Sequence, residues 1–312
     1  MPKAFRRALV TGGAGFIGSH LVDELIRCRM QVCVVDDLSS GERSFVNPKA
    51  EFFQMSINDP EFFFLVQRIK PDVIFHLAAQ INVRYSVKNP RHDAEVNILG
   101  TLAVLQAAKE SNVKKIVFSS SGGAMFGKGK PPYTEMVSPN PFSPYGISKR
   151  AAELYFLQTQ ALYNLPCVIL RYANVYGPRQ GAKGEAGVIS VFARRMLAGG
   201  SVTMNGSGKQ TRDFVYVDDV VAANILAMKF PQSDLFHIGT GKETSILTLY
   251  RAMEKCMNIS LALNHIPPVS GEVMHSSLDA HRARRVLKWQ PTVKLEEGLQ
   301  RTIAWFKMQE KK

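Results

Sequence analysis

Long apolar runs are missing from this sequence, and cysteine is scarce. A helix that crosses a bilayer needs about 20 consecutive apolar residues, and no stretch approaches that length, so no membrane partner is expected. The basic N-terminus leads into an apolar strand without a small-residue cleavage site, so no signal peptide is expected. We interpret the four cysteines as reduced thiols of a cytoplasmic protein without a metal site, because none forms a CxxC pair: Cys28, Cys33, Cys167 and Cys256.

Acidic residues are the minority among the charged ones. The chain has 26 Asp and Glu against 39 Lys and Arg, a formal net charge of +13. Such an excess can attract nucleic acid, an anionic membrane or a polyanionic small substrate. The basic residues are scattered apart from Arg282, Arg284, Arg285 and the two ends, and they do not alternate with aromatic residues. We therefore expect a small anionic substrate and no nucleic-acid partner.

Short apolar runs alternate with longer amphipathic stretches in the first half of the chain. The runs are apolar on both faces, which is typical of parallel strands covered by helices on both sides. The pattern predicts an α/β fold with a doubly wound parallel Rossmann sheet. The expected strands are 8–10, 32–35, 73–77, 116–119 and 167–170, and the expected helices are 17–28, 60–69, 96–110 and 148–163.

The local composition of the sequence changes after about Asn174, where segments rich in Gly, Pro and polar residues become frequent and predict loops. No linker and no internal repeat separates the two parts, so they should pack tightly. We predict a Rossmann domain over residues 1–173 and a smaller C-terminal substrate domain over 174–312. Segments around 214–245 are expected to return to the Rossmann part.

A glycine turn follows the first expected strand and opens the first expected helix. It reads TGGAGFIG from Thr11 to Gly18. In a dinucleotide fingerprint of this kind, Gly12 permits the tight turn, Gly15 lets the backbone approach the pyrophosphate, and Gly18 allows close packing of helix and strand. The phosphates then meet the positive end of the helix.

Two carboxylates follow at the end of the second expected strand. Asp36 ends the strand and Asp37 comes next. A carboxylate there accepts hydrogen bonds from the adenosine ribose and repels the 2′-phosphate of NADP. Because no arginine stands at this strand end, we predict NAD as the cofactor. The alternative, a solvated acidic turn, is disfavoured by the preceding glycines.

Tyr145 and Lys149 form a YxxxK pair. Residues one helical turn apart share a face, so Lys149 can lie beside Tyr145 and the cofactor ribose. A free tyrosine has a pKa of about 10, but a nearby ammonium favours the phenolate. Tyr145 is therefore a candidate general base, and the alternative is an ordinary surface helix.

Three serines end the fourth expected strand, Ser119 to Ser121. Hydroxyls at the carboxyl end of a parallel strand face the cleft in which such sheets bind ligands. One of them can orient the reacting hydroxyl. We favour Ser121, with Ser120 as the rival.

These segments together resemble the UDP-glucose 4-epimerase branch of the extended short-chain dehydrogenase/reductase family over essentially the whole chain. The similar segments are TGGAGFIGSHL (11–21), DDLSSG (36–41), HLAAQ (76–80), SPYGISK (143–149), RYANVYGPRQ (171–180), GEAGVI (184–189) and TRDFVYVDD (211–219).

The resemblance implies an NAD-dependent 4-epimerase that works through a 4-keto sugar. Tyr145 would take the proton of the sugar 4-hydroxyl, and Ser121 and Lys149 would assist. It also implies a homodimer, paired through helices such as 96–110 and 148–163. Beyond Gly12, Gly15, Gly18, Asp36, Asp37, Tyr145 and Lys149, the implied NAD contacts are Phe16, Ile17, Leu38, Ser39, Ser40, Gly41, Ser56, Ile57, Leu77, Ala78, Ala79, Gln80, Asn97, Ser119 and Tyr172.

The resemblance also implies a nucleotide-sugar site in the C-terminal part. Arg212 would pair with the diphosphate, where a guanidinium makes charge-assisted hydrogen bonds. Thr203 and Asn205 would lie near the nucleobase. Serine at position 276 would admit a 2-N-acetyl group, so that UDP-GlcNAc/UDP-GalNAc are expected beside UDP-glucose/UDP-galactose. The implied substrate contacts are Ser121, Asn174, Val188, Ile189, Thr203, Asn205, Arg212 and Ser276.

The sequence departs from the pattern of this branch at several positions. Gly122 and Gly123 extend the serine strand, Phe126 replaces a usual tyrosine, and Ser56 stands for a usual aspartate. Val269 stands where an arginine commonly contacts the phosphates, so that Arg212 or His275 would have to compensate.

Two other activities of similar enzymes need residues that this chain lacks after its serine strand. A 4,6-dehydratase needs an acid–base pair directly after the strand-end hydroxyl, where this chain has Gly122 and Gly123, and the same stretch argues against a decarboxylase. An unusual dehydratase or reductase of a cell-surface or natural-product pathway stays open. A non-catalytic NAD-binding regulator is the second alternative, although such proteins typically lose the Tyr or the Lys.

Overall fold

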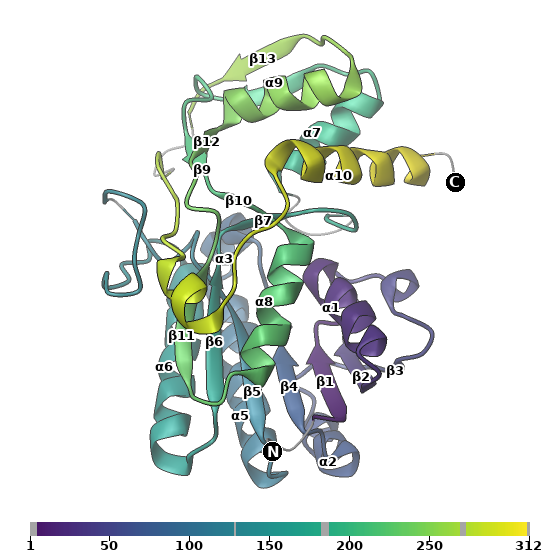
Figure 1. Ribbon diagram of the computed structural model, residues 1–312, viewed down its shortest axis with the longest axis vertical. Helices are drawn as coiled ribbons and strands as arrows, with labels where there is room; N and C mark the ends of the chain where they lie inside the picture. Colours follow the sequence, from purple (N-terminus) through teal and green to yellow (C-terminus); the bar gives the residue numbers. More distant parts are fainter. Residues whose placement is uncertain (1–4, 128, 182–186, 269–272, 311–312) are drawn as a thin grey trace.

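The computed structural model describes residues 5–127, 129–181, 187–268 and 273–310. A parallel sheet of seven strands forms its centre, in the order β11-β6-β5-β4-β1-β2-β3. Figure 1 shows the sheet in the lower part of the molecule and a smaller helical part above it. The strands are β1 (Arg7–Thr11), β2 (Gln31–Asp36), β3 (Glu51–Gln54), β4 (Val73–His76), β5 (Lys115–Ser121), β6 (Cys167–Tyr172) and β11 (Asp234–Ile238).

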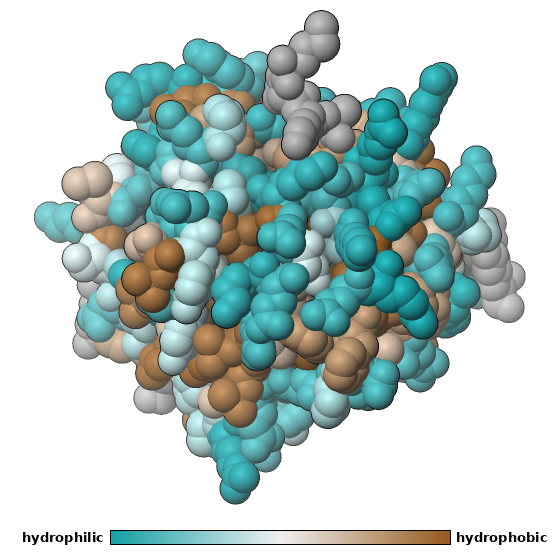
Figure 2. Space-filling model, turned by 90° about the horizontal axis from the view of Figure 1, so that it is seen from below, coloured by the Kyte–Doolittle hydropathy of each residue, from teal (hydrophilic) through white to brown (hydrophobic). Residues whose placement is uncertain are grey.

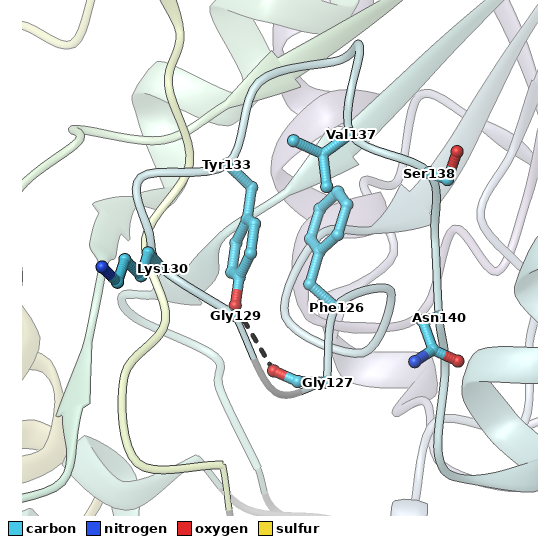
Figure 3. Close-up of a pocket in the computed structure, with 8 residues that line it drawn as sticks. All are labelled: Phe126, Gly127, Gly129, Lys130, Tyr133, Val137, Ser138 and Asn140. Carbon is cyan, nitrogen blue, oxygen red and sulfur yellow. Dashed lines mark hydrogen bonds between the residues drawn. The ribbon is translucent and has the colours of Figure 1, made fainter.

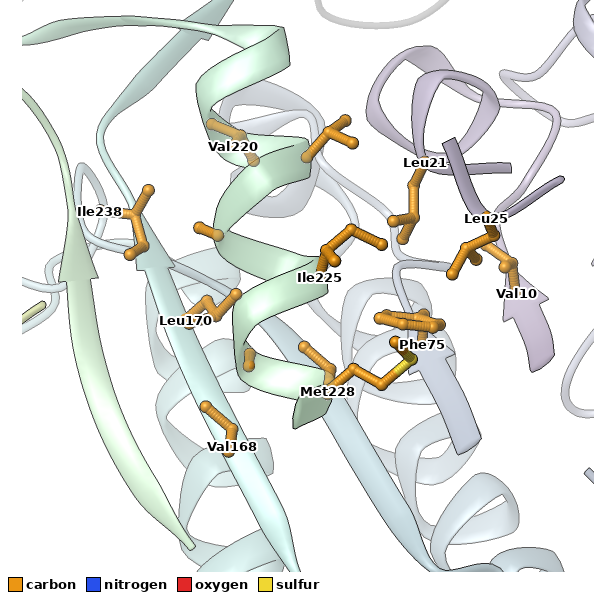
Figure 4. Close-up of a cluster of buried hydrophobic side chains, with 14 of the residues drawn as sticks. Val10, Leu21, Leu25, Phe75, Val168, Leu170, Val220, Ile225, Met228 and Ile238 are labelled. Carbon is orange, nitrogen blue, oxygen red and sulfur yellow. The ribbon is translucent and has the colours of Figure 1, made fainter. Parts of the chain in front are cut away.

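Helices cover both faces of the sheet, as the doubly wound prediction requires. One face packs against α1 (Phe16–Arg27) and α8 (Val217–Lys229). Figure 4 shows Val10, Leu170 and other strand side chains meeting Leu21 of α1 and Val220 of α8. The other face packs against α2 (Pro60–Ile69), α5 (Gly100–Glu110) and α6 (Pro144–Tyr163).

Successive residues of β1 divide between these two cores. Ala8 and Val10 lie in the first core, and Leu9 lies in the second. A strand that is buried on both faces must be apolar at every position, which is why the sequence showed unbroken apolar runs instead of alternation.

The sequence missed two strands of the sheet, β3 and β11. They read EFFQ and DLFHI, so each contains only two consecutive apolar residues beside polar ones, and they form the two edges of the sheet. An edge strand has only one neighbour and is less completely buried, so it needs no continuous apolar run. Helix α8 and strand β11 bring residues 217–238 back to the sheet.

Two predicted helices differ from their expected bounds. The helix expected at 148–163 begins at Pro144, because Ser143 caps it by accepting a hydrogen bond from Gly146 N, and proline suits the first turn. Tyr145 is therefore helical. The helix expected at 96–110 begins as a π-helical turn, η2 (Glu95–Leu99), and becomes α-helical at Gly100.

The remaining elements build the C-terminal part and the connections. A third core joins α7, α9 and α10 to the short strands beneath them. No helix in the described ranges is both long enough and apolar enough to cross a bilayer. The other elements are η1 (Arg43–Phe45), α3 (Val83–Lys88), α4 (Pro90–Ala94), β7 (Asn174–Tyr176), α7 (Val188–Leu197), β8 (Val202–Asn205), β9 (Thr211–Arg212), β10 (Phe214–Tyr216), β12 (Thr244–Ser245), α9 (Ile246–Met257), β13 (Leu263–Ile266), η3 (Ala283–Leu287) and α10 (Leu295–Gln309).

Candidate active site

The glycine turn links β1 to α1 at the carboxyl edge of the sheet. Gly12 has φ of +72°, and a Cβ there would lie 2.7 Å from the backbone nitrogen of Ala78. A Cβ on Gly18 would collide with the Gly12 carbonyl oxygen. The fold itself therefore demands glycine at 12 and 18. A Cβ on Gly15 would meet only Gly12 O, at 3.2 Å, so the predicted close approach of a pyrophosphate gives a separate reason for glycine there.

Asp36 lies at the end of β2, beside this turn. Its Oδ2 accepts a hydrogen bond from Ala14 N at 2.9 Å, and its Oδ1 accepts one from Leu38 N at 2.9 Å. Burial raises the pKa of the Asp36 carboxyl, while the two backbone hydrogen bonds lower it. Asp37 instead accepts hydrogen bonds from the backbone and hydroxyl of Ser39, within its own loop. Asp36 is thus the carboxylate held against the glycine turn, and the turn and this carboxylate fit the phosphates and ribose of NAD.

The segment after β4 closes the other side of the turn. Ala78 N donates to Thr11 Oγ1 at 3.3 Å, so residues 77–80 run alongside the end of β1. Gln80 and Asn97 bind each other twice: Gln80 N donates to Asn97 Oδ1, and Asn97 Nδ2 donates to Gln80 O, both at 2.9 Å. The π-helical turn thus holds Asn97 at the predicted cofactor segment, and π-turns are frequent at functional sites.

Lys149 is buried beneath the end of β5. Its Nζ donates to the carbonyl oxygen of Ser119 at 3.0 Å and lies 5.0 Å from the ring centroid of Phe118. Burial lowers the pKa of Lys149 to about 8, and the carboxylates of Asp93 and Glu153 oppose that shift. Tyr145 stands one helical turn earlier on α6 and is half-buried. The structure therefore brings Lys149 of the YxxxK pair to the serine strand and places Tyr145 one turn before it on the same helix.

The three serine hydroxyls have different partners. Ser119 Oγ bonds the hydroxyl of Tyr172 at 3.0 Å. Ser120 Oγ donates to Glu153 Oε1 at 2.7 Å, on the opposite face of the strand. Ser121 is half-buried at the strand end, where its Oγ accepts a hydrogen bond from Ala124 N at 3.3 Å. Because Ser120 is committed to Glu153, the geometry favours Ser121 over Ser120 as the hydroxyl for a substrate.

A buried ion pair that the sequence analysis missed lies behind Ser120. Glu153 is fully buried, and Arg171 donates to its two oxygens at 2.8 and 2.7 Å. Arg150 adds a third charged contact at 3.0 Å. Burial alone would raise the pKa of the Glu153 carboxyl, but these hydrogen bonds hold it below its usual range. The spacing of Glu153 one turn after Lys149 was the available signal.

The loop after β5 is tied to the segment that carries Ser276. Tyr133 N donates to Ser277 O at 3.0 Å, and Asp279 N donates to Tyr133 O at 2.8 Å. Gly122 lies against the side chain of Leu278, which a Cβ would strike. Packing against Leu278 therefore explains why Gly122 is a glycine, and this contact joins the serine strand to the segment 276–279.

A small pocket lies in this same loop. Figure 3 shows Phe126 and Tyr133 face to face, with ring centroids 4.4 Å apart and an interplanar angle of 13°. The Tyr133 hydroxyl donates to Gly127 O at 3.3 Å. Phe126 is buried, and the guanidinium of Arg171 lies 5.8 Å from its ring centroid. The phenylalanine that departs from the usual tyrosine thus packs in the interior without needing a hydroxyl partner.

The candidate substrate residues come from several elements of the C-terminal part. Asn174 begins β7, and its Oδ1 lies 3.8 Å from where a Cβ of Gly123 would stand. The Arg212 guanidinium donates to the carbonyl oxygens of Thr211 and Val273, each at 2.8 Å. Thr203 Oγ1 accepts a hydrogen bond from Arg195.

The side chains of the remaining candidates differ in exposure. Val188 is half-buried at the start of α7, whereas Ile189 is buried in the third core and can offer a ligand only its backbone. Asn205 is half-buried and Ser276 is buried. Val269 and residues 184–186 of the GEAGVI segment lie outside the described residues.

The ring of His275 already contacts other side chains and is a poor candidate to bind a phosphate. Its Nδ1 lies 3.1 Å from Glu243 Oε2 and 3.1 Å from Thr211 Oγ1. The structure therefore pairs His275 with a carboxylate, and Arg212 is the better candidate to compensate for Val269.

The glycine turn, the Asp36 carboxylate and the Tyr–Lys pair define a dinucleotide-dependent enzyme of the extended short-chain dehydrogenase/reductase type. A model of the NAD dependent epimerase/dehydratase family matches residues 8–239. The chain belongs to this family, and NAD is its cofactor.

Similar proteins cover nearly the whole chain. The UDP-glucose 4-epimerase of Mycolicibacterium smegmatis is 43% identical, over 96% of this chain and 98% of that protein. A crystal structure of UDP-glucose 4-epimerase with UDP-glucose, from Thermotoga maritima, is 45% identical with a TM-score of 0.96, over 97% of this chain and 99% of the other. A UDP-N-acetyl-alpha-D-glucosaminuronate decarboxylase of Bacillus cytotoxicus is 34% identical, over 97% of this chain and 98% of that protein.

Proposed function

We propose that this protein is an NAD-dependent UDP-sugar 4-epimerase that interconverts UDP-glucose and UDP-galactose and also accepts UDP-GlcNAc and UDP-GalNAc. The observation that carries the proposal is the buried Lys149 ammonium, which donates to Ser119 O and lies one helical turn from Tyr145. The similarity to UDP-glucose 4-epimerases supports it.

Tyr145 is the proposed general base. The positive charge of Lys149 favours the phenolate over the neutral phenol, which lets Tyr145 take the proton of the sugar 4-hydroxyl near neutral pH. Ser121 accepts or donates a hydrogen bond at the same hydroxyl and orients it. Bound NAD supplies the hydride acceptor and donor. Tyr145 later returns the proton, when the 4-keto sugar has turned its other face to the site.

The absence of an acid–base pair beside Ser121 supports epimerisation over dehydration. Gly122, Gly123 and Ala124 follow the strand, so this described stretch offers no carboxyl group to remove water across C5 and C6. The buried Glu153 binds Ser120, the residue before Ser121, and its charge is already neutralised by Arg171. In this proposal, a keto sugar formed beside Ser121 receives its proton back from Tyr145 and returns to the hydroxyl form.

The two parts of the chain divide the ligands between them in this proposal. Residues 1–173 bind NAD, and residues 174–312 mainly bind the nucleotide sugar. Asn174 and Ser276 approach the sugar from the C-terminal part, and Ser276 leaves room for the 2-N-acetyl group. Arg212 pairs with the diphosphate.

A homodimer belongs to the same proposal. The outer face of α6 exposes apolar side chains, and large contiguous apolar surface on a monomer commonly marks an interface. Figure 2 shows hydrophobic patches among hydrophilic surface on the face seen from below. The exposed apolar residues of α6 and η2 are Leu99, Ile147, Leu154, Tyr155, Leu157, Leu162 and Tyr163.

The test is epimerisation without an added reductant or oxidant. Purified protein is mixed with UDP-GlcNAc, and separately with UDP-glucose, and the anomeric protons of the sugars are followed by NMR. We expect the galacto epimer to appear in both reactions and to be lost in Tyr145→Phe. If neither sugar changes when NAD is supplied and its binding is verified, the proposal is wrong. If a sugar is consumed but a product other than the epimer appears, the chemistry is that of the alternative, a dehydratase or reductase.

A further inference from the structure

A second buried carboxylate lies beside the candidate active site. Asp93 stands near the end of α4 and is only 1% exposed. Its Oδ1 accepts hydrogen bonds from Gln80 Nε2 at 2.7 Å and from Asn97 Nδ2 at 3.1 Å. Its Oδ2 is also buried and has no hydrogen-bond partner among the described residues. Nothing in the proposed reaction uses Asp93 directly.

An unpaired carboxylate oxygen in the interior is costly unless a positive charge lies close by. The cation on which the Asp93 charge acts is Lys149, on the helix α6 that packs against α4. A chain of hydrogen bonds connects the two elements, since Asn97 Nδ2 also donates to Ser148 Oγ at 3.2 Å, next to Lys149. Burial lowers the pKa of Lys149 to about 8, and Asp93 is the strongest influence that raises it again.

Other groups around Lys149 do not supply this negative charge as well. Glu153 is neutralised by Arg171 and Arg150, and it also accepts a hydrogen bond from Ser120. His76, on β4, is neutral, because burial and then the charge of Lys149 lower its pKa to about 3. Around Lys149, therefore, Asp93 is the carboxylate that has no cation bound to its own oxygens within the described chain.

We propose that Asp93 is a positioning residue of the epimerase, which keeps the Lys149 ammonium charged beside Tyr145 and fixes Asn97 and Gln80 at the cofactor segment. The inference rests on the proposed function, because Tyr145 is a base only while Lys149 carries its charge. Asp93 acts through Lys149 and does not touch the substrate.

The decisive variant is Asp93→Asn, which keeps the acceptor for Gln80 and Asn97 and removes the charge. The titration of Lys149 is followed by NMR in protein labelled with ¹³C at the lysine Cε, and Lys149→Met identifies the resonance. A nearby opposite charge shifts the pKa of an ionisable group by about 1 to 3 units. Because Asp93→Asn removes such a charge, we expect the midpoint of the Lys149 titration to fall by about one unit. Asp72→Asn is the control and should leave it unchanged, because Asp72 lies just before β4, at the amino ends of the strands, where it binds Lys114.

An unchanged Lys149 midpoint in folded Asp93→Asn would overturn the inference. If Asp93→Asn fails to fold, Asp93→Glu takes its place, because it keeps the negative charge. The Lys149 midpoint in Asp93→Glu must then stay near its wild-type value. A fall of about one unit in this variant would also reject the charge argument. These titrations need no substrate. They therefore test the role of Asp93 even if the wild-type protein epimerises neither sugar. That outcome would contradict the proposed function and leave the Asp93 inference to be decided by the titration.

The dependence of the rate on pH gives the second readout. If the wild-type protein is an epimerase, the loss of kcat on the alkaline side should begin about one pH unit lower in Asp93→Asn. A purely structural role would instead lower the amount of active enzyme equally at every pH. The same alkaline limb in both proteins would contradict the proposal.

Discussion

Ser120 and Glu153 are joined by a hydrogen bond of 2.7 Å that crosses from the end of β5 to the middle of α6. Because side chains alternate along a strand, this bond turns Ser119 and Ser121 to the opposite face. It therefore assigns different roles to adjacent serines that the sequence alone left as rivals.

The first prediction separates these serines by mutation. Ser121→Ala should reduce kcat by about 10-fold to 100-fold, since it removes a hydrogen bond to the reacting hydroxyl. Ser120→Ala should keep most of the activity and lower the free energy of unfolding by about 1 to 2 kcal/mol, since Glu153 loses a buried donor. Initial rates by NMR and urea unfolding measure the two effects. The reverse assignment would follow if Ser120→Ala were the inactive variant.

A second prediction concerns the buried ion pair. Glu153→Gln leaves the Arg171 guanidinium buried without its counter-ion, and such a loss costs about 3 to 5 kcal/mol. Urea denaturation should reveal it. The control is Glu24→Gln, which breaks an ion pair with Arg27 on the surface of α1. Exposed pairs contribute less than about 1 kcal/mol, so Glu24→Gln should be nearly neutral.

A third prediction follows from the buried histidines. Burial, and then the charge of Arg171, lower the pKa of His237 to about 4 in the folded protein. An unfolded histidine titrates near 6.5, so between about pH 6.5 and pH 4 the unfolded chain binds a proton that the folded chain does not. Acidification through this window must destabilise the protein, by about 1.4 kcal/mol per pH unit for this histidine.

His237→Gln tests the third prediction. The variant should show a shallower fall of the unfolding free energy between pH 6.5 and pH 4 than the wild-type protein, measured by urea unfolding at each pH. Parallel curves for the two proteins would mean that the pKa of His237 is the same in the folded and the unfolded protein, against the prediction.

The fourth prediction concerns the cofactor. Asp36→Ala removes the carboxylate expected to bind the adenosine ribose and should weaken NAD binding by about 10-fold or more, in line with charge-assisted hydrogen bonds of about 1.5 to 3 kcal/mol. Isothermal titration with NAD measures the loss. Asp37→Ala should weaken NAD binding less than Asp36→Ala, because the Asp37 carboxylate binds Ser39 of its own loop and Asp36 is the one held against the glycine turn.

The fifth prediction concerns assembly. Leu154→Glu places a charge on the exposed apolar face of α6 and should dissociate the proposed homodimer, which sedimentation velocity would detect. Phe64→Glu is the control, since Phe64 is similarly exposed but lies on α2. If the wild-type protein sediments as a monomer, the proposed interface is wrong.

The sequence predicted those features that short patterns encode. The glycine turn, Asp36 and the Tyr145–Lys149 pair each depend on residues that are close in the chain, so their spacing carried the information. The cofactor and the family followed from them, and the comparisons confirmed both.

Features that depend on distant partners were not predictable in the same way. The pairing of Glu153 with Arg171 needs the register of β6 beside β5, and the burial of Asp93 needs the packing of α4 on α6. The strands β3 and β11 were missed because edge position, not composition, makes them strands. The roles of the individual site residues stay predictions.

The backbone pairing of Tyr133 with the segment at Ser277 has a mechanical consequence. Two backbone hydrogen bonds join the loop after β5 to the segment 276–279, one donated by Tyr133 N to Ser277 O and one donated by Asp279 N to Tyr133 O. Neither segment can move away from the other without losing these bonds, so a displacement at Ser276 is passed on to the loop that follows Ser121.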